Sequence, residues 1–345
     1  MRAPLRLVPG ILLATLVGLA ALGIARLETR AFGQPVVEGL VVAILLGMLV
    51  RAAWEPPAAT DAGVAFTAKQ VLEIAVLLLG ASVDLPLLLT HGWGLAAGIV
   101  AIVILGIGAS FAIGRIIGLP RKLAILVACG TGICGNSAIA AVAPVIRADH
   151  EHVASSIAFT ALLGVLVVIA LPLLVTPLHL NFYQYGVLAG LTVYAVPQVL
   201  AAAFPVSALS GQVGTLVKLV RVLMLGPVVL FFALTHRRET AAPAGSMTAM
   251  TASRRTSVTT FVPWFIIGFL LLAILRSTDV LPDRWVAVAR AISTWLTVAA
   301  MAALGLGVDV RAVRKVGAPV IATVTISLLV LIALAVALIR GLQIR

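Results

Sequence analysis

The stretch Gly130-Thr131-Gly132-Ile133-Cys134-Gly135-Asn136-Ser137 lies in the middle of an apolar run from about Leu123 to Ile146. Each glycine lowers helix stability by about 1 kcal/mol relative to alanine, so a cluster of glycines disfavours a continuous helix. The stretch therefore predicts a break in the apolar helix. An alternative interpretation is that the glycines let neighbouring helices pack closely, as small residues often do in membranes.

Polar groups in the same stretch favour a functional break. Inside a membrane, an interrupted helix frees backbone N–H and C=O groups, which then need to face protein, a cavity or a ligand. Many secondary transporters build substrate sites from such discontinuous helices, since the N-terminus of a half-helix offers N–H donors and a positive dipole end. We expect Thr131, Asn136 and Ser137 to line such a site, together with Gly132 and Gly135.

The composition indicates a membrane protein. Of the 345 residues, 62% are hydrophobic and only 10% are charged, and a soluble domain cannot bury that much apolar surface. Apolar runs long enough to cross about 30 Å of hydrocarbon recur along the whole sequence. The net charge of +12 comes from basic residues at the ends of these runs. It therefore reports membrane topology rather than nucleic-acid binding, which needs a basic cluster on a folded surface.

The apolar runs predict an all-α, polytopic helical membrane protein with about eleven transmembrane segments. The expected segments are residues 7–26, 35–51, 67–89, 93–117, 121–146, 152–175, 183–204, 208–234, 260–277, 285–307 and 316–340. The first run is long for the apolar core of a signal peptide, so it is interpreted as a retained helix. We expect one transmembrane domain over residues 1–345, with a first helix group to about residue 235, a polar linker at 236–260 and three last helices at 261–345.

Basic residues are distributed unequally between the two sides of this arrangement. Fourteen Lys and Arg residues fall in loops on the side of the N-terminus, seven fall on the opposite side and three lie within segments, which accounts for all 24. Because cytoplasmic loops carry the excess of Lys and Arg, we predict a cytoplasmic N-terminus and a cytoplasmic linker. An odd number of crossings then places the C-terminus outside.

Two later segments carry helix-breaking or charged residues. In residues 183–204, Pro197 and Gln198 interrupt the apolar pattern, and a proline inside a helix kinks it. In residues 208–234, Lys218 and Arg221 are three positions apart and share one helix face. Charged groups at membrane depth are functional candidates by default.

The role of these two cations stays open at this point. Lys218 and Arg221 could bind substrate, pair with Glu73 or Glu38, or extend to the membrane interface. Glu73 and Glu38 are also candidates for coupling transport to protons or sodium. For Arg290, near the start of the tenth segment, we expect extension toward the interface.

A short internal similarity suggests a repeat. Leu79-Gly80-Ala81-Ser82-Val83-Asp84 in the third segment resembles Leu304-Gly305-Leu306-Gly307-Val308-Asp309 in the tenth. Seven crossings separate the two copies, so they would run in opposite directions, as inverted repeats do in alternating-access transporters. We expect Asp84 and Asp309 to cap or gate the turns that follow.

The residues around the break also resemble a known family. Cys129-Gly-Thr-Gly-Ile-Cys134-Gly-Asn-Ser-Ala-Ile-Ala-Ala-Val-Ala-Pro144-Val-Ile is similar to the signature of the YeiH-type sulfate exporter family of bacterial inner-membrane proteins. Val217-Lys218-Leu-Val-Arg221-Val and Ala302-Ala-Leu-Gly305-Leu-Gly307 resemble later motifs of that family. The resemblance covers essentially the whole chain. It implies a location in the inner (plasma) membrane and a fold related to sodium/proton antiporters and bile-acid symporters, with two inverted repeats and crossed broken helices.

The seventh segment departs from that family's pattern. Family members often carry a histidine and an acidic residue before Ala-Gln-Val-Val-Ala-Ala, whereas this chain has Tyr194 and Ala195 in that part of the segment and retains Gln198. If the histidine and the acid carry protons or contact substrate in relatives, coupling or specificity differs in this protein.

Together these features predict a site for a small oxyanion, with helix N-termini, polar side chains and two cations as donors. The candidates are Thr131, Gly132, Gly135, Asn136, Ser137, Gln198, Lys218, Arg221, Gly305 and Gly307. The broken fifth segment contains no carboxylate. Its absence disfavours a cation/proton antiporter, although Glu73 could substitute from a neighbouring helix.

The leading hypothesis is a secondary transporter that exports a small anion, which the resemblance implies to be sulfate. The alternative is a proton- or sodium-coupled transporter of an organic anion or sulfonate. An enzyme is not expected, because no His-Glu-x-x-His or Gly-x-Ser-x-Gly motif is present.

No metal or other cofactor is expected either. Cys129 and Cys134 fit neither a disulfide framework nor a zinc-ligand spacing. The expected partners are the lipid bilayer and the anion, without nucleic acid. A passive channel and a homo-oligomer both stay open.

Overall fold

The computed structural model describes residues 6–32, 39–54, 56–83, 92–239, 264–278, 280–308 and 317–342. These residues form helices, and no strand occurs in the described ranges. The predicted fold class is therefore confirmed as all-helical.

The helices follow the apolar runs; short 3₁₀ or π turns carry the label η. The first half of the chain forms α1 (Val8–Phe32), α2 (Gly39–Ala53), η2 (Ala58–Thr60), α3 (Asp61–Phe66), η3 (Thr67–Val71), α4 (Leu72–Leu79), η4 (Gly80–Ser82), α6 (Gly92–Ile116), α7 (Arg121–Cys129), η6 (Gly130–Cys134), α8 (Asn136–Val142) and α9 (His150–Ala170). The second half forms η7 (Leu171–Leu174), α10 (Phe182–Thr192), α11 (Val196–Ala203), α12 (Ala208–Leu223), α13 (Leu225–Glu239), α14 (Trp264–Ser277), α15 (Asp283–Leu306) and α16 (Ala318–Gly341).

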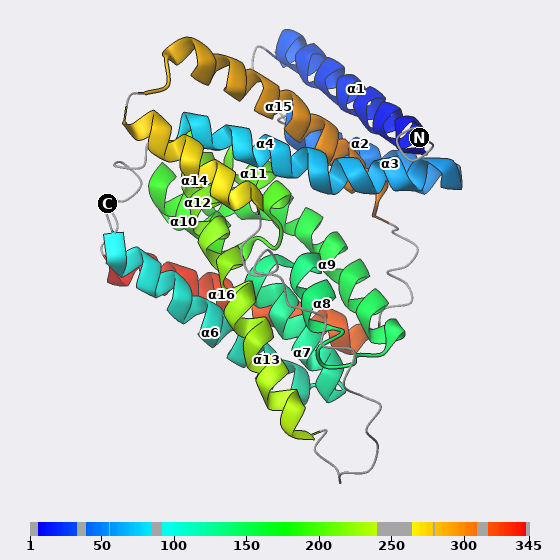
Figure 1. The fold of residues 1–345 in the computed structure, drawn as a ribbon, viewed down its shortest axis with the longest axis vertical. Coiled ribbons are helices and arrows are strands. Elements are labelled where there is room, and N and C mark those ends of the chain that lie inside the picture. The colour runs from blue at the N-terminus through cyan, green and yellow to red at the C-terminus, as the bar shows by residue number, and fades with distance from the viewer. Residues whose placement is uncertain are drawn as a thin grey trace, which may run out of the picture.

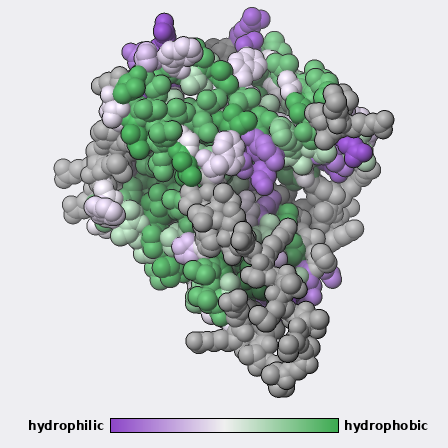
Figure 2. Space-filling view, viewed as in Figure 1, coloured by the Kyte–Doolittle hydropathy of each residue, from purple (hydrophilic) through white to green (hydrophobic). Residues whose placement is uncertain are grey.

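Several of these helices can cross a membrane. Within the described ranges, the stretches that are long and apolar enough are six: Val8–Glu28, Ala58–Ser82, Gly92–Ile116, Ala208–Thr235, Asp283–Leu306 and Ala318–Gly341. Their outer faces are apolar, since Trp93 is 92% exposed and Ile116 83%. Figure 2 shows hydrophobic side chains over much of the visible surface. The chain is thus a multi-pass membrane protein, and helix length and composition support six crossings within the described residues; the prediction of about eleven segments stays a prediction.

The third segment begins earlier than predicted. The chain is helical from Ala58 to Ser82, whereas the predicted third segment begins at residue 67. The hydroxyl of Thr60 donates to the carbonyl of Pro57 at 2.8 Å, and that of Thr67 donates to Gly63 at 2.8 Å. Because these hydroxyls find backbone acceptors about one turn earlier in the chain, they need no water.

The helices pack in two groups (Figure 1). The first group contains α1 to α4 with α14 and α15, and the second contains α6 to α13 with α16. In the first group α15 lies beside α1, α2 and α4, and in the second α16 lies beside α6 and α10. The grouping in space therefore differs from the order along the chain, in which α14 to α16 follow the polar linker. Residues 240–260 of that linker lie outside the described residues.

Close backbone contacts join α2 and α15 in the first group. A Cβ atom at Gly305 would lie 2.2 Å from the carbonyl oxygen of Ile44, and one at Gly47 would lie 2.4 Å from that of Ala302. Only glycine permits this approach, which is the small-residue packing common between membrane helices. Gly305, a predicted substrate-site residue, thus lies in a helix contact. Gly307 is exposed at the C-terminal end of α15.

We expect Gly305→Ala to destabilise the protein by about 1–3 kcal/mol, because the added methyl group overlaps the Ile44 carbonyl. Gly23→Ala is the matched control, since a Cβ atom at Gly23 meets nothing within 4 Å and alanine favours the helix. Thermal unfolding of the purified variants measures the difference. An unchanged Tm for Gly305→Ala would contradict the tight contact between α2 and α15.

Candidate functional site

The fifth apolar segment is broken at Gly135. The π turn η6 continues α7 as far as Cys134, and the N–H of Gly135 donates to the carbonyl of Gly130 at 2.9 Å. Gly135 has φ +66° and ψ −126°, and α8 begins at the next residue, Asn136. A side chain at this φ would be strained, which explains the glycine. The break predicted from the sequence is confirmed.

The seventh segment is broken at residues 193–195. The helix α10 ends at Thr192, and Val193 and Ala195 are extended, with ψ values of 144° and 150°. The helix α11 starts at Val196 and has Pro197 in its first turn. This proline therefore begins a helix and does not kink one, because its missing N–H would have had no partner in a first turn anyway.

The helix α12 places Lys218 and Arg221 beside both breaks. Glycines on α10 permit the close approach: a Cβ atom at Gly190 would lie 2.6 Å from the carbonyl oxygen of Gly214, and one at Gly186 would lie 2.8 Å from that of Ser210. Lys218 and Arg221 lie ten and thirteen residues after the first residue of α12, about three and three and a half turns into the helix, and both are 0% exposed. They are therefore inside the second helix group and do not extend to an interface.

Lys218 joins the two breaks directly. Its Nζ donates to the carbonyl of Ile133 at 2.6 Å and to the carbonyl of Val193 at 2.8 Å. Ile133 lies at the end of η6 and Val193 at the end of α10. Of the three N–H groups on the ammonium, these bonds use two.

Arg221 makes five hydrogen bonds to the same two chain ends. Its Nη2 donates to Thr131 at 3.1 Å and to Gly132 at 2.9 Å, and its Nε donates to Gly132 at 3.3 Å. Its Nη1 donates to Gly190 at 2.8 Å and to Val193 at 3.3 Å. All acceptors are backbone carbonyls. A guanidinium has five N–H groups, so every donor of Arg221 is engaged.

These bonds show where the two cations are held, and they disfavour two of the alternatives, extension to the interface and pairing with Glu73. Carbonyls at the end of a helix have no partner within the helix, and Lys218 and Arg221 supply partners for both interrupted ends. Pairing with Glu73 does not occur, because the Glu73 carboxylate accepts a hydrogen bond from Trp264 Nε1 at 2.9 Å in the first helix group. The other acidic candidate, Glu38, lies outside the described residues.

The two breaks meet beside Lys218 and Arg221, and this place, the crossing, carries excess positive charge. With both side chains protonated, Lys218 and Arg221 carry +2. The C-terminal ends of η6 and α10 contribute about −0.5 each, and the N-terminal ends of α8 and α11 at the same breaks contribute about +0.5 each. Among the described residues, the buried charged side chains are these two cations, and no carboxylate is buried. The site can therefore attract an anion.

Asn136 and Gln198, two further predicted site residues, contact one face of the helix α9. The Thr160 hydroxyl donates to Oδ1 of Asn136 at 2.5 Å. A Cβ atom at Gly164 would lie 2.1 Å from Nε2 of Gln198, whose Oε1 accepts from the N–H of Ala195 at 3.1 Å. Thr160 and Gly164 are four positions apart and share a helix face. The starts of α8 and α11 thus converge on α9, which the sequence had not indicated, because one threonine and one glycine in an apolar run are unremarkable.

The remaining candidates have more ordinary positions. The hydroxyl of Thr131 donates to Val127 at 2.8 Å within its own helix, so only its carbonyl serves Arg221. A Cβ atom at Gly132 would lie 2.5 Å from the Ile107 side chain of α6. Ser137 is exposed at the start of α8. Asp84 and Asp309 lie outside the described residues.

Tyr194 supplies a polar group without a partner. Its side chain is 1% exposed, and its hydroxyl has no hydrogen-bond partner among the described residues. It is close enough to Arg221 for the two groups to interact electrostatically, and its Cβ lies 3.4 Å from where a Cβ of Gly135 would be. A buried hydroxyl without a partner costs about 1–3 kcal/mol, so a ligand or water that accepts from Tyr194 would remove this cost.

The comparisons with known proteins identify the family. The family model described as "Conserved hypothetical protein 698" matches residues 9–324. The chain belongs to this family. A UPF0324 membrane protein of Bradyrhizobium diazoefficiens is 52% identical over 97% of this chain and 93% of its own length.

More distant UPF0324 membrane proteins share most of the chain as well. One from Brucella melitensis is 50% identical over 97% of this chain and 90% of its own length. One from Bacillus cereus is 32% identical over 89% of this chain and 87% of its own length. No solved structure matches the chain. Since these relatives are membrane proteins, the family agrees with the apolar helices of the fold.

We expect Arg221→Met to destabilise this family member by at least about 3 kcal/mol, because backbone carbonyls at both breaks lose their donors. Arg115→Met is the matched control: Arg115 is exposed, and its Nη1 donates to one carbonyl, that of Leu119, at 2.6 Å. Thermal unfolding in detergent compares the two. Equal losses would show that the Arg221 bonds do not hold the crossing together.

Proposed function

We propose that the protein is a secondary transporter that moves a small oxyanion by alternating access, with sulfate as the leading substrate. The observation that carries this proposal is the crossing of two broken helices on two fully buried cations, Lys218 and Arg221, with no buried carboxylate among the described residues. Burying charge at membrane depth costs at least a few kcal/mol, so such groups are kept for a function.

The charge balance at the crossing favours an anion over a cation. A cation/proton antiporter needs an acid that binds the cation and the proton in turn. The described carboxylates are not buried, and Glu73 is bonded to Trp264 in the other helix group. The excess positive charge left by Lys218 and Arg221 would instead lower the energy of an oxyanion.

Two groups at the crossing are free to contact the anion. Lys218 uses two of its three N–H groups on carbonyls, which leaves one for a ligand. The buried hydroxyl of Tyr194 has no described partner and can donate to an oxygen of the anion. Arg221, with every donor engaged, would act as fixed positive charge and as the brace of the crossing.

The resemblance to the YeiH-type sulfate exporter family suggests the substrate and the direction. Under this proposal the protein lies in a bacterial inner membrane with a cytoplasmic N-terminus, crosses about eleven times, and exports the anion. An organic anion or sulfonate coupled to protons or sodium is the alternative. No enzymatic role is proposed.

A reciprocal helix contact supports an inverted repeat. The similar stretches at residues 79–84 and 304–309 each carry a glycine that touches the backbone of another helix. A Cβ atom at Gly80 would lie 2.3 Å from the carbonyl oxygen of Phe269 in α14, and one at Gly305 would lie 2.2 Å from that of Ile44 in α2. In an inverted repeat that equates α4 with α15 and α2 with α14, these two contacts are equivalent, as a two-fold relation requires.

Sulfate efflux from proteoliposomes tests the proposal. We expect saturable flux from the wild type and loss of flux in Lys218→Met and Asn136→Ala, because the first removes a free donor and the second the amide held by Thr160. Lys122→Met is the control, since the exposed Lys122 Nζ donates to the carbonyl of Arg147 far from the crossing. Imposed pH and sodium gradients report coupling. Folded protein without sulfate flux under any gradient would refute sulfate as the substrate.

The Tyr194 hydroxyl allows a sharper test. Tyr194→Phe removes a buried hydroxyl without a partner, so we expect Tm to stay the same or rise while the half-saturating sulfate concentration rises about tenfold. Tyr185→Phe should lower Tm and leave the half-saturating sulfate concentration unchanged, because the Tyr185 hydroxyl donates to the carbonyl of Ala202 at 2.8 Å. If Tyr194→Phe leaves sulfate affinity unchanged, the hydroxyl does not contact the anion.

A further inference from the structure

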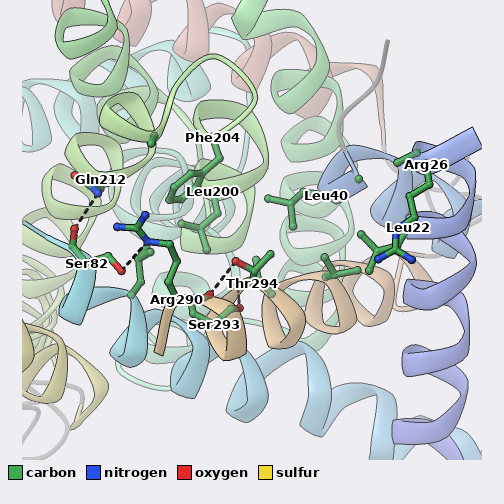
Figure 3. Close-up of a pocket in the computed structure, with 16 residues that line it drawn as sticks. Leu22, Arg26, Leu40, Ser82, Leu200, Phe204, Gln212, Arg290, Ser293 and Thr294 are labelled. Carbon is green, nitrogen blue, oxygen red and sulfur yellow. Dashed lines mark hydrogen bonds between the residues drawn. The ribbon is translucent and has the colours of Figure 1, made fainter. Parts of the chain in front are cut away.

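A pocket of about 420 Å³ lies between the two helix groups. Its walls come from α1, α2, α4 and α15 of the first group and from α11 and α12 of the second. Figure 3 shows Leu22 and Arg26 on α1, Leu200 and Phe204 on α11, and Arg290 on α15 around this space. The volume lies in the range of small-molecule sites.

The pocket is separate from the crossing of the broken helices. Lys218 and Arg221 do not line it. Gln212, which does, precedes Lys218 by six residues on α12, and at 1.5 Å per residue this is about 9 Å along the helix. A ligand in the pocket would therefore have its own set of contacts.

Two arginines give the pocket a positive charge. Arg26 and Arg290 are in its lining, and none of the described residues that line it is Asp or Glu. Within the described ranges, neither guanidinium is in an ion pair with a carboxylate. Arginine binds carboxylate, sulfonate and phosphate groups through paired N–H donors. The charge and the donors thus favour an oxyanion.

Arg290 is held in place while most of its donors stay free. Its Nε donates to the hydroxyl of Ser82 at 3.3 Å, and Nε2 of Gln212 donates to the carbonyl of Ser82 at 2.9 Å. Figure 3 shows this chain of contacts across η4, α12 and α15. The Nη1 and Nη2 groups of Arg290 donate to no described residue, so they are available to a ligand. Arg290, for which extension toward the interface was expected, is an exposed residue that also lines this pocket.

The rest of the wall is largely apolar, which excludes a bare inorganic ion as the best occupant. Leu22, Leu40, Leu200 and Phe204 face the space in Figure 3. A sulfate ion bound to Arg290 would leave these side chains against water, whereas an apolar body on the same ion would cover them. Each buried methylene adds about 0.8 kcal/mol, a factor of about four in affinity.

We propose that this pocket binds an organic oxyanion with an apolar body, with Arg290 and Arg26 as its charge partners and the leucine and phenylalanine side chains as its apolar wall. The oxyanion can belong to a free metabolite or to an anionic lipid headgroup, since both present the same chemistry to a guanidinium. Because the ligand touches both helix groups, it bridges them. This binding does not depend on whether sulfate is the transported ion.

Binding of short n-alkanesulfonates, from ethane- to pentanesulfonate, to the full-length protein in phosphatidylcholine nanodiscs tests the proposal. In calorimetric titrations of the wild type we expect affinity to rise about fourfold per added methylene and sodium sulfate to compete weakly. Arg26→Gln/Arg290→Gln should reduce pentanesulfonate affinity at least about tenfold. Ala208→Trp, which fills the pocket from the exposed start of α12, should abolish binding.

Arg284→Gln is the matched control, because Arg284 lies on the same helix as Arg290, packs over Trp285 and does not line the pocket. Its affinity should equal that of the wild type. Nanodiscs that contain phosphatidylglycerol distinguish the two sources: if a lipid headgroup occupies the site, phosphatidylglycerol displaces pentanesulfonate from the wild type and co-purifies with it but not with the double variant. If neither pentanesulfonate nor phosphatidylglycerol binds the wild type more tightly than the double variant, the proposal is wrong. The assay uses no ion gradient, so its failure would leave the sulfate proposal to its own flux test.

Discussion

Two interrupted helices inside a membrane leave backbone carbonyls without partners, and the structure depends on how these are satisfied. Lys218 and Arg221 of α12 donate to the carbonyls at the ends of η6 and α10. The approach is possible because Gly190 and Gly214 let α10 and α12 nearly touch. These two side chains thus replace hydrogen bonds that two continuous helices would have made. The freed carbonyls are therefore satisfied within the protein, as the membrane interior requires.

The same solution creates the electrostatics of the site. Because the partners of the cations are carbonyls and not carboxylates, their charge is only partly offset, and the second helix group keeps positive potential in its interior. The buried Tyr194 hydroxyl adds a donor there. Arg221 bonds backbone carbonyls at both breaks with all its N–H groups, and Lys218 does so with two of its three; in the proposed transporter the third N–H of Lys218 would contact the anion.

The two helix groups divide the remaining tasks. The second group holds both breaks, and α9 supports the starts of α8 and α11 through Thr160 and Gly164. The first group, held by the glycine contact of α2 with α15, supplies Arg26 and Arg290 to the pocket between the groups. A ligand there would contact both helix groups, which are the groups that would move relative to each other if the protein works by the proposed alternating access.

The sequence by itself determined the class of the protein, both helix breaks and the importance of Lys218 and Arg221, because hydropathy, glycine clusters and charges in apolar runs act locally. It left the partners of the two cations open. It predicted Gly305 as a substrate-site residue, whereas Gly305 lies in the contact between α2 and α15. It did not indicate that Thr160 contacts Asn136 or that Arg290 lines a pocket. Those features are contacts between segments far apart in the chain. Only the tertiary structure decides them, since backbone carbonyls, which accept all the bonds of Lys218 and Arg221, carry no signature in a sequence.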